Sequence, residues 1–332
     1  MERAVSRGLQ PCSESACSGV TMSRRIAIVM PTCNAGPGLD GVLSAIRAQV
    51  GPFQSEIVAI DSGSTDGTVD RLKRQGGRVL SVAAGEFNHG KTRNDALREI
   101  DGEYAVLLVQ DAIPASSTWL ATLVHPLLDD PSIAGTFARQ VPRASASRVT
   151  AHYLARWVAA APEPRTVGPL TREVFERMSP ADRHSACAFD NVCSCIRLSV
   201  WNDHPFPATP IGEDLEWARD VLLAGYKLSY VPDAVVEHSH ERSIAYELQR
   251  TYLVHQRLEA LFGFTTVPTI GSLVRSIATT VPANARMAAD EPSRRVRAVL
   301  RGAALGIAQP IGQYLGARAA REGRELLRTS RI

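Results

Sequence analysis

Short aliphatic runs alternate with amphipathic stretches in the first third of the chain. The runs are 26–30, 56–60, 79–82 and 104–109. The stretch after the first run places aliphatic side chains on one helical face, namely Leu39, Val42, Leu43 and Ile46, and 92–100 also has a helical pattern. Strands and helices that alternate at this spacing predict βαβ units and therefore a parallel sheet.

The α/β pattern continues in the second half, around a less regular excursion. Helices are predicted over 119–127, 213–223 and 243–262, and strands near 133–141, 189–196, 228–231 and 234–237. Residues 143–183 contain four spaced prolines and no clear period. Long connections of this kind are more often functional than idle in compact domains.

The pattern changes from 263 onward. Apolar residues recur at helical spacing from Val296 to Ile311, and nine arginines stand against two glutamates between 294 and 331. A basic amphipathic helix can lie on an anionic membrane surface, or it can pack on the main domain or on a second subunit. We expect a helical C-terminal extension over 263–332 and leave both locations open.

The composition is that of a globular protein. The chain has 332 residues, 45% of them hydrophobic and 21% charged, and its net charge of +3 is too small to indicate nucleic-acid binding. No apolar run approaches the ~18–20 residues of a spanning helix. Residues 1–23 lack the apolar core of a secretory signal and are predicted to be a disordered leader, with Met22 as an alternative start. The six cysteines lack paired zinc-ligand spacings, which favours reduced thiols in a cytosolic protein.

Polar loops follow the first two predicted strands. Pro31, Thr32 and Asn34 end the first strand, and Asp61 and Asp66 lie in the loop after the second. These motifs resemble those of family 2 glycosyltransferases of GT-A fold, P-x-[FYT]-N and V-D-[DS]-G-S-x-D. The resemblance implies a Rossmann-like, mixed, mostly parallel sheet flanked by helices. It divides the domain at 24–262 into a nucleotide-sugar half (24–142) and an acceptor and catalytic half (143–262).

The same resemblance implies that Asp61 contacts the nucleotide base, with Pro31, Thr32 and Asn34 in the same pocket. Backbone amides and an Asp at strand ends are chemically suited to bind a base and its ribose. Asp61 and Asp66 have an alternative role in turns and helix caps. We favour this alternative for Asp66 and nucleotide binding for Asp61.

The loop at 85–94 opens a predicted helix with His89, Lys91 and Arg93. Backbone amides and cations at a helix start can bind a phosphate. The pattern F-x-H-G-x-T-R-N resembles the rhamnosyltransferase subset of the family, some of whose members use dTDP-L-rhamnose. The alternative is that Arg93 pairs with an acid and His89 fills the loop.

A single carboxylate follows the fourth predicted strand. The family has D-x-D here, and alignment places Val109 at the first acid, Gln110 in the middle and Asp111 at the last. Gln110 is also expected to contact the nucleotide-sugar donor. The related T-Q-D-A-x-P is typical of the rhamnosyltransferase-like members. Mg²⁺ or Mn²⁺ often takes one or two carboxylates from protein and its other ligands from phosphate and water, so Asp111 suffices chemically. The alternative is a turn residue at a strand end.

Two further motifs lie in the second half. The resemblance implies that His238 ligates the metal, while His240, on the same face of the predicted strand, contacts the diphosphate or is structural. Glu213 and Asp214 resemble the family's [E/D]-D motif, whose second acid is the catalytic base, so Asp214 is the predicted base with Glu213 in support. Acids in a first helical turn can also simply complement the helix dipole.

These patterns together predict an inverting glycosyltransferase that depends on a divalent cation, Mg²⁺ or Mn²⁺. The expected donor is dTDP-L-rhamnose, and the expected acceptor is a hydroxyl of a cell-envelope glycan or lipid-linked glycan. The expected location is the cytoplasm, including the inner face of the cytoplasmic membrane. Two alternatives are a UDP- or GDP-sugar donor and a non-catalytic nucleotide-sugar-binding protein. A sugar nucleotidyltransferase is disfavoured because Pro31–Asn34 is not a Gly-rich loop with Arg and Lys.

Overall fold

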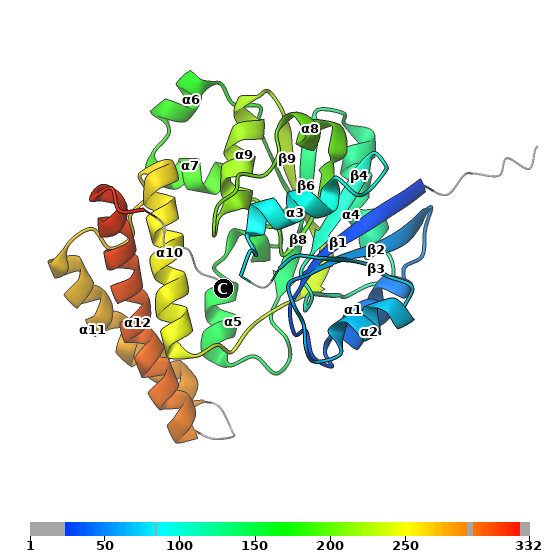
Figure 1. The fold of residues 1–332 in the computed structure, drawn as a ribbon. Helices are drawn as coiled ribbons and strands as arrows, with labels where there is room; N and C mark the ends of the chain where they lie inside the picture. The colour runs from blue at the N-terminus through cyan, green and yellow to red at the C-terminus, as the bar shows by residue number, and fades with distance from the viewer. Residues whose placement is uncertain (1–23, 84, 291–294, 326–332) are drawn as a thin grey trace, which may run out of the picture.

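One mixed sheet forms the centre of the protein, with helices on both faces (Figure 1). The computed structural model describes residues 24–83, 85–290 and 295–325, so the predicted leader at 1–23 lies outside the described residues. The strands are β1 Arg24–Thr32, β2 Phe53–Asp61, β3 Arg78–Ser81, β4 Tyr104–Leu108, β5 Ile113–Pro114, β6 Ile133–Val141, β7 Arg165–Val167, β8 Cys193–Arg197 and β9 Lys227–Glu237.

The order of the strands is β3-β2-β1-β4-β8-β6-β9-β5, and β7 also pairs with β9. The first four strands of this order are parallel, as the βαβ pattern predicts, while β8 runs antiparallel to both β4 and β6. All five residues of β4 are buried because this strand lies between two others and is covered on both faces. The expected mixed, mostly parallel sheet is confirmed.

Helices cover the sheet and extend beyond it. They are α1 Leu39–Arg47, α2 Thr68–Arg74, α3 His89–Leu97, α4 Trp119–Asp129, α5 Arg148–Leu154, α6 Arg172–Arg177, α7 Pro180–Ala186, α8 Leu198–Asp203, α9 Glu213–Leu223, α10 Ile244–Phe262, α11 Ile270–Ala289 and α12 Arg295–Arg321, with a 3₁₀ turn η1 at Val158–Ala160. The apolar face predicted for α1 is completely buried. Residues 143–183, irregular in sequence, fold into short pieces, α5, η1, β7, α6 and α7.

The prediction of two short strands at 228–231 and 234–237 is wrong in one respect, because both belong to the continuous strand β9. Its register against β6 shifts where Val231 pairs with Ala138 and Val235 pairs with Arg139. The intervening residues, including Pro232, therefore form a bulge. A proline has no N–H to donate to a ladder, which explains its place there and the turn-like signal in the sequence.

The C-terminal region is helical, as predicted, and α10, α11 and α12 pack together at one side of the sheet domain (Figure 1). Glycines of α12 let the backbones approach closely. A Cβ on Gly316 would lie 2.1 Å from the carbonyl oxygen of Tyr252 in α10, and one on Gly306 would lie 2.8 Å from backbone atoms of Val281 in α11. The sequence predicts helical structure throughout 263–332 but does not give α11 bounds of its own. Within the described residues, no helix has the length and apolarity needed to cross a membrane.

Candidate active site

The loops that follow β1 and β2 are bound to each other through Asp61. Its two oxygens accept four hydrogen bonds, from the Thr32 hydroxyl, from the backbone N–H groups of Gly63 and Ser64, and from the Ser64 hydroxyl. A carboxylate has about four acceptor sites. The buried Asp61 side chain thus organises both loops, and its contact with a nucleotide base stays a prediction.

Asn34 and Asp66 strengthen this connection. The Asn34 side chain accepts from the Thr65 N–H at 2.8 Å, and its backbone N–H donates to the Ser64 hydroxyl at 2.8 Å. Asp66 accepts from the N–H groups of Gly36 and Thr68, which is the turn and cap role favoured from the sequence. Pro31 and Thr32 lie in β1 beside the end of β2.

Gln110 connects the same loop to the end of β4. Its side-chain oxygen accepts from the Cys33 N–H at 2.9 Å, and its side-chain nitrogen donates to the Cys33 carbonyl at 3.1 Å. This reciprocal pair satisfies both backbone groups of Cys33. The structure therefore shows Gln110 as a connection between loops, next to Asp111.

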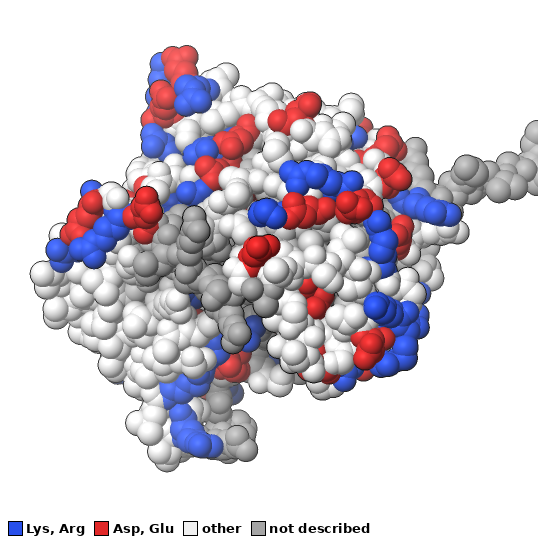
Figure 2. All heavy atoms as spheres, viewed as in Figure 1, with Lys and Arg blue, Asp and Glu red and all other residues white. Residues whose placement is uncertain are grey.

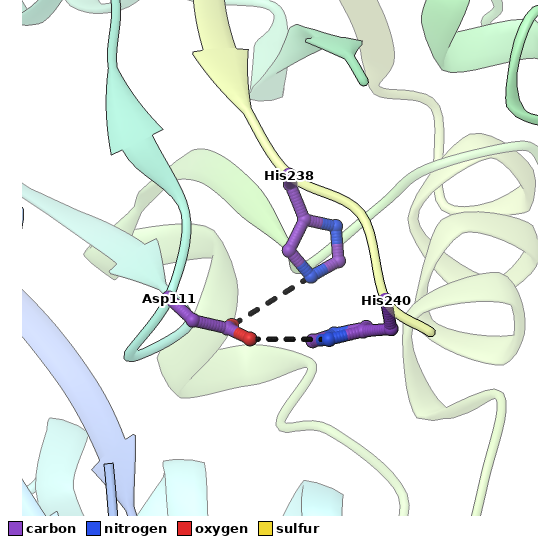
Figure 3. Close-up of side chains that lie close together, drawn as sticks. All are labelled: Asp111, His238 and His240. Carbon is purple, nitrogen blue, oxygen red and sulfur yellow. Dashed lines mark ion pairs between the residues drawn. The ribbon is translucent and has the colours of Figure 1, made fainter. Parts of the chain in front are cut away.

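Asp111 meets two imidazoles at the carboxyl end of the sheet (Figure 3). His238 Nε2 lies 3.7 Å from one Asp111 oxygen, and His240 Nδ1 lies 3.3 Å from the other. They meet because the chain turns after Asp111 into β5, where Ile113 pairs with Glu237 at the end of β9. The sequence paired Asp111 with His238 and left the role of His240 open. One ligand atom from each of the three residues lies within 4.8 Å of the others.

This arrangement fits a divalent cation. The three side chains are only partly buried, so an ion can reach them, and they offer one oxygen and two nitrogens. Burial lowers the pKa of His238 to about 4, more than Asp111 raises it, so the imidazole is neutral near pH 7. A neutral imidazole is the form that ligates metals.

Gln140, which the sequence did not single out, determines which nitrogen of His238 is available. The Gln140 side-chain nitrogen donates to an Asp190 oxygen at 2.6 Å, so its side-chain oxygen faces His238 Nδ1 at 2.9 Å. Nδ1 must then donate, which leaves the Nε2 lone pair directed toward Asp111. Partners of this kind orient metal ligands and fix their tautomer. The signal in the sequence is an amide near the end of a predicted strand.

Two adjacent carboxyl groups at the start of α9 have opposite electrostatic environments. Burial opposes ionisation of Glu213, but Arg93 and then His89 hold its pKa below the usual range. Burial, followed by repulsion from Glu213 and Asp190, raises the pKa of Asp214 well above its usual range. Such a divergence within a pair separates an ionised, structural carboxylate from one able to exchange a proton.

The cations expected to bind phosphate have protein partners. Arg93 is 4% exposed, and its Nη1 donates to Glu213 at 2.9 Å, which is the alternative that the sequence left open. Lys91 pairs with Asp95 at 2.6 Å, and His89 packs edge-on against Phe87. Phosphate contacts by these three residues stay predictions.

Arg143, another residue that the sequence analysis missed, lies at the cluster of Asp111, His238 and His240. Its guanidinium donates to the carbonyl oxygen of Asp111, and its charge lowers the pKa of His238 and His240. The signal that could have found it is its position two residues after β6, at the sheet edge where the functional loops gather.

The arrangement of strands and loops is that of a GT-A glycosyltransferase, and solved structures show the same fold. The mannosyltransferase PcManGT from Pyrobaculum calidifontis, in complex with GDP-Man and Mn²⁺, superposes with a TM-score of 0.58 at 19% identity, covering 91% of this chain and 88% of that one. Glucosyl-3-phosphoglycerate synthase from Mycobacterium tuberculosis, in complex with Mn²⁺, UDP and glucosyl-3-phosphoglycerate, gives 0.51 at 20% identity, covering 75% of this chain and 82% of that one.

Sequence comparison is more specific. Residues 27–177 match the model of glycosyl transferase family 2. The O-antigen chain rhamnosyltransferase RfbN of Salmonella typhimurium is 31% identical over 236 residues, which are 69% of this chain and 70% of that protein. The O-antigen chain rhamnosyltransferase WbaN of Salmonella anatum is 28% identical over 231 residues, 68% of this chain and 69% of that protein. The chain belongs to glycosyltransferase family 2 and is a glycosyltransferase.

Proposed function

We propose that this enzyme transfers L-rhamnose from dTDP-L-rhamnose to a hydroxyl of a cell-envelope glycan or lipid-linked glycan, with inversion at the anomeric carbon. The observation that carries the donor assignment is the likeness to RfbN over most of both chains, at 31% identity. The variant Gln110–Asp111 and the loop at 85–94 support the same subset. A UDP- or GDP-sugar is the alternative donor.

Asp111, His238 and His240 would hold the divalent cation, Mn²⁺ or Mg²⁺. Two nitrogen donors favour Mn²⁺ over Mg²⁺, because imidazole is a poor ligand for the harder ion. Two solved structures of this fold are complexes with Mn²⁺ together with a nucleotide or nucleotide sugar. When bound, the cation would neutralise charge on the leaving diphosphate.

Asp214 is the proposed catalytic base. Burial and the neighbouring carboxylates Glu213 and Asp190 raise its pKa, which makes the carboxylate a better proton acceptor. In the transfer, an Asp214 oxygen takes the acceptor hydroxyl's proton while the hydroxyl oxygen forms the new bond to the anomeric carbon and the diphosphate leaves. Glu213 stays ionised against Arg93 and supports the start of α9.

We further propose that α12 brings the enzyme to an anionic membrane surface. Val296, Leu300 and Ile307 of this helix are 73%, 65% and 43% exposed, and Arg297 is exposed between the first two. Much of the surface over α11 and α12 in Figure 2 is uncharged, with Lys and Arg near its ends. Aliphatic side chains flanked by cations suit the interface of an anionic bilayer. Co-sedimentation with anionic but not neutral vesicles, reduced by Leu300→Asp, tests this placement.

A donor screen tests the function. Purified enzyme with Mn²⁺ and a lipid-linked acceptor is given dTDP-rhamnose, UDP-galactofuranose, UDP-glucose or GDP-mannose, and nucleoside diphosphate release is measured. We expect release from dTDP-rhamnose, loss of it with EDTA, and recovery with Mn²⁺. Asp214→Asn should abolish turnover but keep donor binding, whereas Asp220→Asn, later on the same helix, should keep both. Full turnover by Asp214→Asn would refute the base assignment, and preference for another sugar would refute the donor.

A further inference from the structure

The segment that carries His240 leaves the sheet after β9 and is held from both sides. The His238 N–H donates to the carbonyl oxygen of Val141 at 2.9 Å, which prolongs the pairing with β6 by one residue. The Arg143 N–H then donates to the Ser239 hydroxyl at 3.2 Å. His240 itself is beyond the ladder, so its position depends on its neighbours in the chain.

Glu241, the next residue, joins three separate parts of the protein. One of its oxygens accepts from the N–H of Ser147, the residue that caps α5, at 3.0 Å. The other accepts from Arg301 Nε of α12 at 3.0 Å, and Arg301 Nη1 also donates to the Arg242 carbonyl at 2.7 Å. Arg301 therefore forms hydrogen bonds both with the side chain of Glu241 and with the backbone of Arg242.

The helix α12, which provides Arg301, packs closely against α11. A Cβ on the adjacent Gly302 would lie 2.9 Å from the Asn284 carbonyl oxygen in α11, so the two backbones are in close contact. Arg301 is 29% exposed and Glu241 39%. An ion pair this exposed contributes little to global stability. Its effect is on where residues 239–242 lie.

We propose that Arg301 of the C-terminal region is a positioning residue for the metal site, which it serves by holding Glu241 and thereby placing His240 beside Asp111. This inference rests on the proposed metal role of Asp111, His238 and His240. It makes α12, which lies outside the residues matched by the family model, a part of the catalytic centre's support. Contacts of α12 with a membrane or another subunit would then be transmitted to the metal.

The test compares Arg301→Ala with Arg297→Ala, a matched loss of an exposed arginine from the same helix. Mn²⁺ affinity is measured by the electron paramagnetic resonance signal of free Mn²⁺, without donor or acceptor. Hydrogen–deuterium exchange of 238–242 is measured in metal-free protein. For Arg301→Ala we expect about tenfold weaker Mn²⁺ binding, the lower end for partners that orient metal ligands, together with faster exchange in this segment. Arg301→Lys should recover only part, because a single ammonium cannot make the same forked contacts.

A double variant separates positioning from general weakening. If Arg301 acts through Glu241, adding Glu241→Ala to Arg301→Ala should weaken Mn²⁺ binding less than the two separate effects combined. Unchanged Mn²⁺ affinity in Arg301→Ala would overturn the inference, whether or not exchange becomes faster. Equal losses in Arg297→Ala and Arg301→Ala would also overturn it. Wild-type protein that fails to bind Mn²⁺ would refute the proposed metal role instead, and exchange at 238–242 would still show whether Arg301 holds the segment.

Discussion

One substitution in the buried pair of Arg93 and Glu213 can test whether Arg93 stabilises the fold or binds phosphate. The two side chains are 4% and 5% exposed, and their charged atoms are 2.9 Å apart. Arg93→Met leaves Glu213 buried beside Asp214, with a hydrogen bond to its own backbone N–H and the 3.4 Å contact to the Asn191 side chain. Removing one member of such a pair costs about 3–5 kcal/mol.

The free energy of unfolding that Arg93→Met loses has an upper bound, because the unpaired Glu213 can take up a proton. At pH 7, protonating a carboxyl group with an unfolded pKa near 4.3 requires about 3.7 kcal/mol, and at pH 5 about 1 kcal/mol. In the wild type the Glu213 pKa is lowered, so its stabilisation is present above the unfolded pKa and is lost as pH falls through the folded value. In Arg93→Met we expect a raised pKa, so the loss of stability should grow from pH 5 to pH 7.

Urea unfolding at both pH values measures this difference. We expect Arg93→Met to lose about 3–4 kcal/mol at pH 7, or roughly 4–6 °C in melting temperature for a chain of 332 residues, and much less at pH 5. Arg98→Met removes an exposed arginine close by and should change stability by less than about 1 kcal/mol. Glu213→Gln should lose the same stability at pH 5 as at pH 7, because the Arg93 guanidinium that it leaves unpaired cannot lose its proton. An Arg93→Met protein that keeps its stability but binds the nucleoside diphosphate weakly would refute the structural role and favour phosphate contact.

Three further predictions concern the tail, the metal site and the base. Gly316→Ala, whose Cβ would collide with the backbone of α10, should destabilise the packing of α12 by about 1–3 kcal/mol in thermal unfolding, whereas Gly271→Ala in an open part of α11 should be neutral or stabilising. Gln140→Leu removes the acceptor that fixes the tautomer of His238 and should weaken Mn²⁺ binding roughly 10–100-fold in titrations. Asp214→Asn should stabilise the fold, because a raised folded pKa means that ionised Asp214 destabilises the native state. Calorimetry should show this gain growing as pH rises above the unfolded pKa of Asp214, and a gain that does not change with pH, or a loss, would contradict it.

Local patterns predicted most of the sheet and its helices. The buried run of β4 and the apolar face of α1 were visible because they depend on nearby residues alone. The helix α11 was expected only as part of a helical extension over 263–332, and its bounds were not predicted, because Pro282 interrupts its pattern and apolar residues such as Val274 are exposed. Its packing against α12 depends on close approach at glycines, which no helical period reveals.

The cluster of Asp111, His238 and His240 could be predicted in part. Asp111 and His238 each follow an apolar strand, and strand ends at one edge of a sheet gather around a ligand. His240 could not be assigned, because its position depends on Glu241 and on Arg301, which is 60 residues away in sequence. Gln140 was missed for a similar reason, since its partners Asp190 and His238 belong to other segments.

The charges of the site show most clearly how the structure revises the sequence. The sequence predicts that cations of the loop at 85–94 bind phosphate. In the structure Arg93 forms an ion pair with Glu213, and Lys91 forms one with Asp95. Arg143, outside every motif, instead lies against Asp111 with its charge near both histidines. A diphosphate at this edge would meet the cluster and Arg143 before it met the buried Arg93. Because the Arg143 guanidinium lies next to the proposed metal ligands, Arg143→Ala should weaken nucleoside diphosphate binding more than Lys91→Ala does. The opposite order in a calorimetric titration would indicate that the phosphates bind at the loop at 85–94.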